Sequence, residues 1–227
     1  ETVLSSGRVR LVDLDNETVK TVSQQFGKTP LPPYIHRDNN IYETQDRQRY
    51  QTVYAEKDGS IAAPTAGLHF TEELLKRIQA HGVKIIPVTL HIGPGTFQPV
   101  RTEAISDHRM EPEYFEVSTQ AIQSIREAKR CGHRIVAVGT SAVRVLESLS
   151  SGDVPAASEQ GCTSLFIFPG FQFKMVDALV TNFHLPRSTL LMLVAAFAGR
   201  EPLLEVYREA LTQHYRFASY GDAMLIL

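Results

Sequence analysis

The strongest constraint on the fold of this chain is a run of nine consecutive apolar residues at positions 190–198. A helix needs about 20 apolar residues to span a bilayer, so this run predicts a buried core helix rather than a membrane segment. We expect the helix to begin near Pro186 and Ser188 and to end at Gly199. A polar stretch with a histidine, residues 181–184, lies directly before it. Core packing does not account for that stretch, which makes it a candidate functional segment.

The composition is typical of an ordinary globular protein, with 43% hydrophobic and 21% charged residues. The formal net charge of −2 excludes a global basic field, so nucleic-acid binding would need a local patch or additional chain. Cys131 and Cys162 form no CxxC pair, and we expect no structural zinc site. Without a signal peptide or a disulfide framework, we expect a cytoplasmic protein with no membrane segment.

A stiff, proline-rich segment at residues 29–34 is the best candidate for a domain boundary. Before it, the pattern predicts two short strands and an amphipathic helix at 18–26. Because a predicted strand begins already at Thr2 and the chain opens at Glu1 without a methionine, we expect upstream residues to be absent from this sequence. Residues 36–49 are polar and are expected to form a surface loop.

From residue 50 onward, helix-like and strand-like patterns alternate. Helices are predicted from Thr71 to Gly82, from Ser118 to Gly132, at 141–149 and at 202–214. Strands are predicted at 83–92, 133–138, 164–168, 176–181 and 223–227. This alternation predicts an α/β fold with a mixed sheet core and surrounding helices.

Three histidines share one local pattern: His69, His91 and His184. Each is flanked by apolar residues at the end of a strand-like or extended segment, beside glycine or proline. Strand ends are where α/β folds build sites, and imidazole suits proton transfer near neutral pH. A buried histidine held by backbone hydrogen bonds is the alternative for each, but the repeated pattern favours a site. No HExxH spacing occurs, so we expect no metal.

Two further segments are candidate ligand-binding loops. One follows His91, and its backbone either approaches a ligand closely or forms a tight turn: Gly93, Gly95 and Thr96. The other runs from a strand through Gly139 into a helix that begins with Thr140 and Ser141. A helix N-terminus can bind a carboxylate or phosphate, although ordinary capping also explains the hydroxyls. Arg144 either clamps an anion or forms an ion pair.

Two charged segments are less specific. Residues 107–114 are typical of a solvated loop. Residues 215–222 combine aromatic side chains with an arginine and a carboxylate, and they form either a packing segment or a pocket wall. In a pocket wall, Asp222 would be an acid or a hydrogen-bond acceptor.

Several runs, spread in order over residues 29–227, together resemble the S-adenosylmethionine:tRNA ribosyltransferase-isomerase family of queuosine biosynthesis. They are TPLPPYI (29–35), RYQTVYA (49–55), AAPTAGLHFT (62–71), TLHIGPGTFQPV (89–100), VGTSAVRVLES (138–148), FIFPG (166–170), VDALVTNFHLPRSTLLMLVAAFAG (176–199) and YRFASYGDAML (215–225). The combination is far more specific than any single run.

The resemblance implies that residues 29–227 form the main α/β catalytic domain. Residues 1–28 would be the C-terminal remnant of a β-barrel domain inserted into it, with the N-terminal part of the family's chain absent. Three positions depart from the family's pattern: Glu111 replaces a histidine, Ser141 a threonine and Ala218 a phenylalanine. His108 is kept.

The resemblance also implies a reaction. The enzyme moves the ribosyl part of S-adenosylmethionine onto 7-aminomethyl-7-deazaguanine in tRNA, isomerises it to give epoxyqueuosine, and releases adenine and methionine. S-adenosylmethionine and the modified tRNA are the expected partners, no metal is expected, and we expect a monomer. The alternative is a module that binds S-adenosylmethionine or a nucleotide without this activity. A generic hydrolase is disfavoured because no GxSxG occurs.

The chemistry then suggests roles for the candidate residues. A base must take the proton beside the sulfonium, for which His69, His91 and His184 are candidates. A histidine or Asp222 would protonate the leaving adenine. Aromatic rings would face the sulfonium cation: Phe70, Phe183 and Tyr220. The methionine carboxylate or a tRNA phosphate would lie against Thr140, Ser141 and Arg144. Further substrate contacts are expected from Thr65, Gly93, Gly95, Thr96, Gly139 and Asn182.

Overall fold

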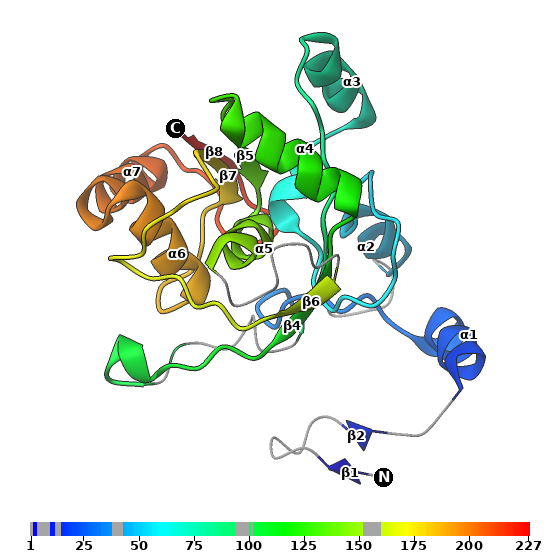
Figure 1. Cartoon of the computed structure of the whole chain (residues 1–227). Helices are drawn as coiled ribbons and strands as arrows, with labels where there is room; N and C mark the ends of the chain where they lie inside the picture. Colours follow the sequence, from blue (N-terminus) through cyan, green and yellow to red (C-terminus); the bar gives the residue numbers. More distant parts are fainter. Residues whose placement is uncertain are drawn as a thin grey trace.

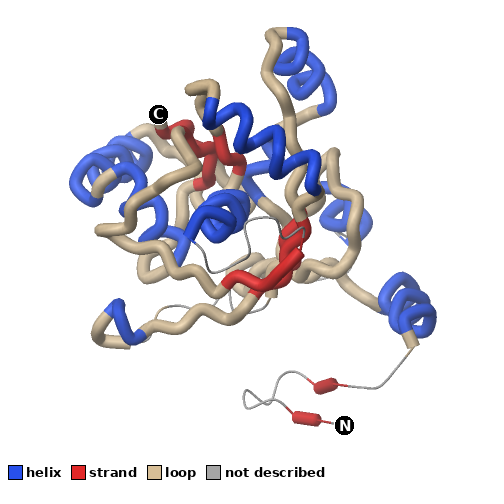
Figure 2. The backbone as a smooth tube through the Cα atoms, viewed as in Figure 1, coloured by secondary structure: helices blue, strands red, loops and turns tan. Residues whose placement is uncertain are grey.

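The computed structural model of the protein describes residues 2–3, 10–11, 15–37, 43–93, 100, 102–151 and 160–227. Within these ranges the chain forms two three-stranded sheets and a short hairpin. Helices surround the sheets, as Figure 1 and Figure 2 show. The predicted mixed α/β fold is therefore confirmed.

The first sheet has the strand order β5-β7-β8, formed by Val136–Val138, Ala178–Asn182 and Ala223–Ile226. β5 and β7 run parallel, whereas β8 is antiparallel to β7. β7 is the central strand and is buried along most of its length, which explains its apolar sequence.

The second sheet is antiparallel, with the order β3-β4-β6, formed by Thr89–His91, Glu113–Glu116 and Gln160–Thr163. Helix α5 (Thr140–Ser151) contacts strands of both sheets. Its Val143 and Leu146 belong to one hydrophobic core, and its Val145 and Leu149 belong to a second. Residues three or four apart share a helix face, so a single helix fills both cores.

Three helices of the α/β body begin where the sequence predicts. α3 (Glu72–Ala80), α4 (Thr119–Arg130) and α6 (Thr189–Ala198) each follow a hydroxyl residue that accepts a backbone N–H of the first turn: Thr71, Ser118 and Ser188. Gly199 after α6 has a φ of 84°, a conformation that favours glycine, and α7 (Arg200–Thr212) follows directly. The apolar run is thus a core helix, and no helix within the described ranges is long and apolar enough to cross a membrane.

The N-terminal segment contains the expected hairpin and helix. β1 (Thr2–Val3) pairs antiparallel with β2 (Arg10–Leu11), and α1 (Asn16–Phe26) follows. Figure 1 shows these elements apart from the α/β body. Their assignment to a barrel domain stays a prediction.

Some predicted elements are wrong. Residues 36–49 contain helix α2 (Glu43–Arg49), whose buried Asp46 binds Arg37 at 2.8 Å. Residues 164–168 form no strand, and only β3 lies within the strand expected at 83–92. β4 was not predicted, because its charged residues suggested a solvated loop, yet Glu113 is buried. Short 3-10 helices, η2 (Thr65–His69) and η4 (Ile105–Asp107), complete the described structure.

Candidate active site

A cavity of about 180 Å³ lies where the parallel strands β5 and β7 end. The segments that follow both strands line it, as expected for an α/β sheet whose ligands bind at the carboxyl ends of strands. Residues predicted from the sequence form part of its wall: Thr65, Gly139, Thr140, Ser141, Asn182 and His184.

The turn from β5 into α5 brings a helix N-terminus to this cavity. Gly139 has a φ of 91° and donates its N–H to the carbonyl of Val180 in β7 at 2.8 Å, which fixes the turn against the neighbouring strand. Thr140 and Ser141 therefore line the cavity at the positive end of the α5 dipole, where an anionic group is stabilised.

His184 lies beside the end of β7 and is buried. Its Nε2 is 2.8 Å from the Thr181 hydroxyl, and its backbone N–H donates to the Tyr207 hydroxyl at 2.8 Å. Burial lowers the pKa of His184 to about 4. The imidazole that faces this cavity is therefore neutral at pH 7.

The two ends of the Asn182 side-chain amide have different surroundings. Its Nδ2 lies near three backbone carbonyl oxygens, those of Ala218 and Gly221 at 3.3 Å and that of Asp222 at 3.5 Å. Carbonyls can only accept, so these contacts fix which end of the amide carries the nitrogen. The Asn182 Oδ1 is buried and has no hydrogen-bond partner within the described ranges. Asn182 lines the cavity, so this unpaired acceptor belongs to a residue of the cavity wall.

His69 and Asp222 both contact the Asn182 amide, and neither lines the cavity. The Nε2 of His69, an exposed residue at the end of η2, is 3.3 Å from the Asn182 Nδ2. The backbone amide of Arg216 donates to the Asp222 carboxylate at 2.7 Å and lowers the pKa of that carboxyl. Asp222 is thus ionised near neutral pH and suits hydrogen-bond acceptance better than proton donation.

His91 lies away from the cavity, in β3. Its ring stacks on that of Tyr114 in β4, with 5.8 Å between centroids and 25° between planes. A Cβ added to Gly59 would lie 2.8 Å from the His91 ring, so glycine is needed for this close approach. The contacts of His91 are those of a packed side chain.

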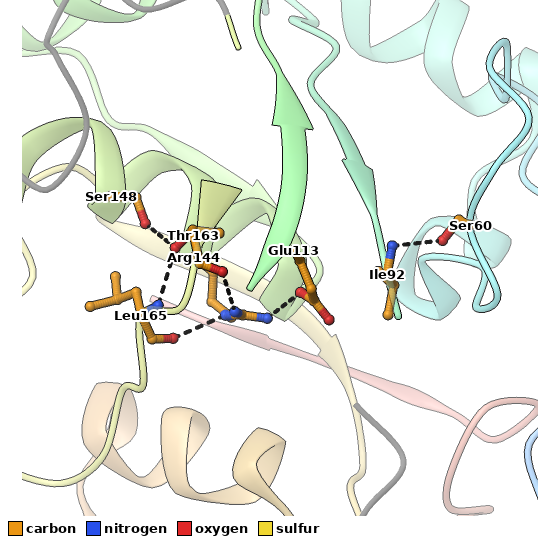
Figure 3. Close-up of polar contacts among 7 residues, drawn as sticks. All are labelled: Ser60, Ile92, Glu113, Arg144, Ser148, Thr163 and Leu165. Atoms are coloured by element: carbon orange, nitrogen blue, oxygen red, sulfur yellow. Dashed lines mark hydrogen bonds and ion pairs between the residues drawn. The ribbon is translucent and has the colours of Figure 1, made fainter. Parts of the chain in front are cut away.

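Arg144 forms a buried ion pair, the second of the two roles left open by the sequence (Figure 3). It pairs with Glu113, and it donates to the carbonyls of Leu165 at 3.0 Å and Thr163 at 3.3 Å. Burial raises the pKa of Glu113, while Arg144 opposes that rise. The carboxylate also accepts the backbone N–H of Gly93, which ties the start of the glycine-containing loop to this pair. Gly95 and Thr96 lie outside the described residues.

The aromatic residues predicted for the site do not line the cavity. Phe183 is buried in a cluster with Tyr207, Tyr215 and Phe217, with ring centroids 5.1 to 5.8 Å away. Tyr220 donates to Asp46 at 3.3 Å, and burial raises the pKa of its phenol to about 12. Phe70 directly follows η2.

Sequence reasoning missed several cavity residues. Tyr34 and Tyr50 line the cavity, and the Tyr34 hydroxyl is 2.5 Å from that of Ser219, another lining residue. Among the described lining residues, Arg187 is the one arginine. It lies in a turn and has a φ of 60°. Tyr34 ends the TPLPPY run and Arg187 follows Pro186, so both lie in motifs that the sequence had marked for other reasons.

A metal site has no support in the described part of the chain, where no three histidine, cysteine or acidic side chains gather closely enough to hold an ion.

Comparison with known proteins identifies relatives. The family described as "Queuosine biosynthesis protein" matches residues 1–226. The chain is 51% identical over 221 residues to the S-adenosylmethionine:tRNA ribosyltransferase-isomerase of Halothermothrix orenii, covering 97% of this chain and 63% of that protein. It is 53% identical over 206 residues to the protein of the same name from Desulforamulus reducens, covering 91% and 59%.

A solved structure is similar as well. The crystal structure of S-adenosylmethionine tRNA ribosyltransferase from Thermotoga maritima has a TM-score of 0.59 and 48% sequence identity, over 72% of this chain and 51% of that one. The chain thus spans about three fifths of the length of the curated relatives it matches, at 63% and 59%. A family match that extends over nearly the whole sequence shows that this chain belongs to the queuosine biosynthesis protein family.

Proposed function

We propose that the protein transfers the ribosyl moiety of S-adenosylmethionine to 7-aminomethyl-7-deazaguanine in tRNA. It isomerises that moiety to the epoxycyclopentanediol of epoxyqueuosine and releases adenine and methionine. The names of relatives that are 51% and 53% identical support this reaction. In this proposal the reaction occurs in the cytoplasm, and the enzyme acts as a monomer.

We also propose that residues 29–227 form the catalytic α/β domain and that residues 1–28 belong to an inserted β-barrel domain. The separation of β1, β2 and α1 from the α/β body in Figure 1 supports this division.

The main observation for placing the reaction in this cavity is the Oδ1 of Asn182, which has no hydrogen-bond partner within the described ranges. A buried acceptor without a partner costs about 1–3 kcal/mol, so such an atom at a cavity wall points to a ligand donor. S-adenosylmethionine offers suitable donors in its adenine amine, its ribose hydroxyls and its ammonium group. The N-terminus of α5 and Arg187 supply the complementary positive charge for the methionine carboxylate.

Tyr34 and Tyr50, rather than Phe70, Phe183 and Tyr220, supply the aromatic faces in this proposal, because both line the cavity. An aromatic face attracts a cation such as a sulfonium.

His184 is the proposed base, since it alone of His69, His91 and His184 lines the cavity. Its pKa of about 4 keeps it in the neutral form that accepts a proton. It takes the proton from the carbon next to the sulfonium, and that carbon keeps the electron pair. Adenine leaves with the electron pair of its glycosidic bond and takes the proton that the aminomethyl nitrogen loses as it bonds to the same ribosyl carbon. The ring C–O bond at that carbon then breaks with its pair on oxygen, and the pair held beside the sulfonium forms the carbon–carbon bond that closes the five-carbon ring. The freed oxygen attacks the carbon beside the sulfonium to form the epoxide, and methionine leaves with the electron pair of its carbon–sulfur bond.

Adenine release under single-turnover conditions tests the base assignment. We expect His184→Ala to slow release by about 10²- to 10⁴-fold, the usual contribution of a positioned general base. His91→Ala is the matched control, because His91 lies outside the cavity wall, and it should keep most of the wild-type rate. A His184→Ala variant that folds and turns over at the wild-type rate would exclude His184 as the base.

A further inference from the structure

A second hollow, of about 360 Å³, lies apart from the residues of the cavity. We call it the aromatic hollow, and its lining residues are His108, Arg109, Met110, Ser164, Phe166 and Phe168. None of these residues lines the cavity described above. The hollow joins two segments that the proposed chemistry does not use, the charged segment 107–114 and the FIFPG run at 166–170.

The aromatic rings of this hollow are held by the protein core. Residues 164–168 alternate in direction, so that Ile167 is only 2% exposed while Phe168 is 37% exposed. The buried Arg144 donates to the Leu165 carbonyl at 3.0 Å and fixes the backbone between the outward-facing residues. The Phe166 and Phe168 rings lie 5.2 Å apart, and the hollow is therefore lined by a preformed aromatic pair.

The polar side chains of the hollow are free to bind. His108 packs edge-on against Phe166, with ring centroids 4.9 Å apart. Within the described ranges, His108, Arg109 and Ser164 form no side-chain hydrogen bond or ion pair. Among the described residues of the lining there is no carboxylate, although the chain as a whole has a net charge of −2. The hollow thus combines a half-buried ring, Phe166, and an exposed ring, Phe168, with a cationic donor, as sites for unpaired nucleobases do.

We propose that the aromatic hollow binds an unpaired nucleobase of the tRNA substrate, outside the modified base that reacts. The base stacks on Phe166 and Phe168, and Arg109 contacts an adjacent phosphate. This inference rests on the proposed function, because that function supplies the RNA. The ring faces suit a base's π-surface, and the arginine distinguishes an RNA from an uncharged apolar partner.

Binding of tRNA by the Phe168→Ala variant of the full gene product tests the proposal. Loss of one stacking platform weakens binding by about tenfold or more, so Kd and KM for tRNA should rise by that factor. KM for S-adenosylmethionine should stay unchanged, because the hollow is separate from the cavity. Phe168→Tyr, which keeps the ring, should restore tRNA binding. Arg109→Ala should lower the salt dependence of binding by about one phosphate contact.

Two matched controls make the result specific. Phe26→Ala removes a ring that is 73% exposed on α1, and Arg77→Ala removes an exposed charge on α3; neither should change tRNA affinity. If Phe168→Ala binds tRNA as well as wild type does, the hollow is not a nucleobase site, even where wild type releases adenine. If wild type neither binds tRNA nor releases adenine, the proposed function fails, and this inference fails with it.

Discussion

Replacing Arg144 by methionine should destabilise the protein strongly and in a pH-dependent way. The variant leaves the Glu113 carboxylate buried without its cation and removes the hydrogen bonds to the Leu165 and Thr163 carbonyls. Removing one partner of a buried ion pair costs about 3–5 kcal/mol. At about 2–4 °C per kcal/mol for a chain of this size, Tm should fall by about 6–20 °C.

The pH dependence follows from the sign of the Glu113 shift. Burial already raises the pKa of Glu113, and loss of Arg144 raises it further. The native variant then binds a proton at a higher pH than the unfolded chain, so its stability falls as pH rises through the native pKa. Urea denaturation should therefore show a larger loss at pH 7 than near pH 5.

The double variant Arg144→Met with Glu113→Gln is the control, because it removes the unpaired charge and should recover part of the stability. A loss below about 1 kcal/mol for Arg144→Met, or an equal loss at both pH values, would refute the assignment of this pair as a buried, charge-compensated contact.

Further predictions concern the backbone, a buried carboxylate and pH. Gly139→Ala should lower the free energy of unfolding by about 1–2 kcal/mol, measured by thermal unfolding, because alanine is strained at a φ of 91°. The added Cβ would clash with nothing, since its nearest neighbour would be 3.9 Å away. Glu147→Ala should cost about 3 kcal/mol or more, and Glu147→Gln less, because the Glu147 carboxylate accepts the backbone N–H groups of Lys174, Met175 and Val176. The native pKa of His184 lies at about 4, below its ordinary 6.5, so the unfolded chain takes up this proton first as pH falls. The free energy of unfolding, measured by urea denaturation, should therefore decrease as pH falls from about 6.5 to about 4. The decrease should be smaller in His184→Asn, which lacks this titrating group.

The sequence was sufficient to predict elements that depend on local signals. Helix caps and stops depend on residues within one helical turn. The structure confirms the predicted caps Thr71, Ser118 and Ser188 and the predicted stop at Gly199. The apolar composition of residues 190–198 likewise required a buried position. β4 could not be predicted, because its charged residues are compatible with burial only through a partner distant in sequence, as with Glu113 and Arg144.

The sequence predicted the site residues that follow strand ends, and it missed those that tertiary packing brings to the cavity. Gly139 and Asn182 directly follow or end the parallel strands, and both line the cavity. Tyr34 reaches the cavity through a contact with Ser219, 185 residues along the chain, which no local pattern encodes. Phe183 occupies the core although it adjoins Asn182, since neighbouring residues in and beside a strand point to opposite sides.

The most direct test of the proposed function is adenine release from S-adenosylmethionine by the full gene product, with and without tRNA that carries 7-aminomethyl-7-deazaguanine. The proposed reaction predicts release only when the modified tRNA is present, with one adenine formed for each tRNA modified. A folded protein that binds S-adenosylmethionine but releases no adenine with the modified tRNA would contradict it and would identify a binding module.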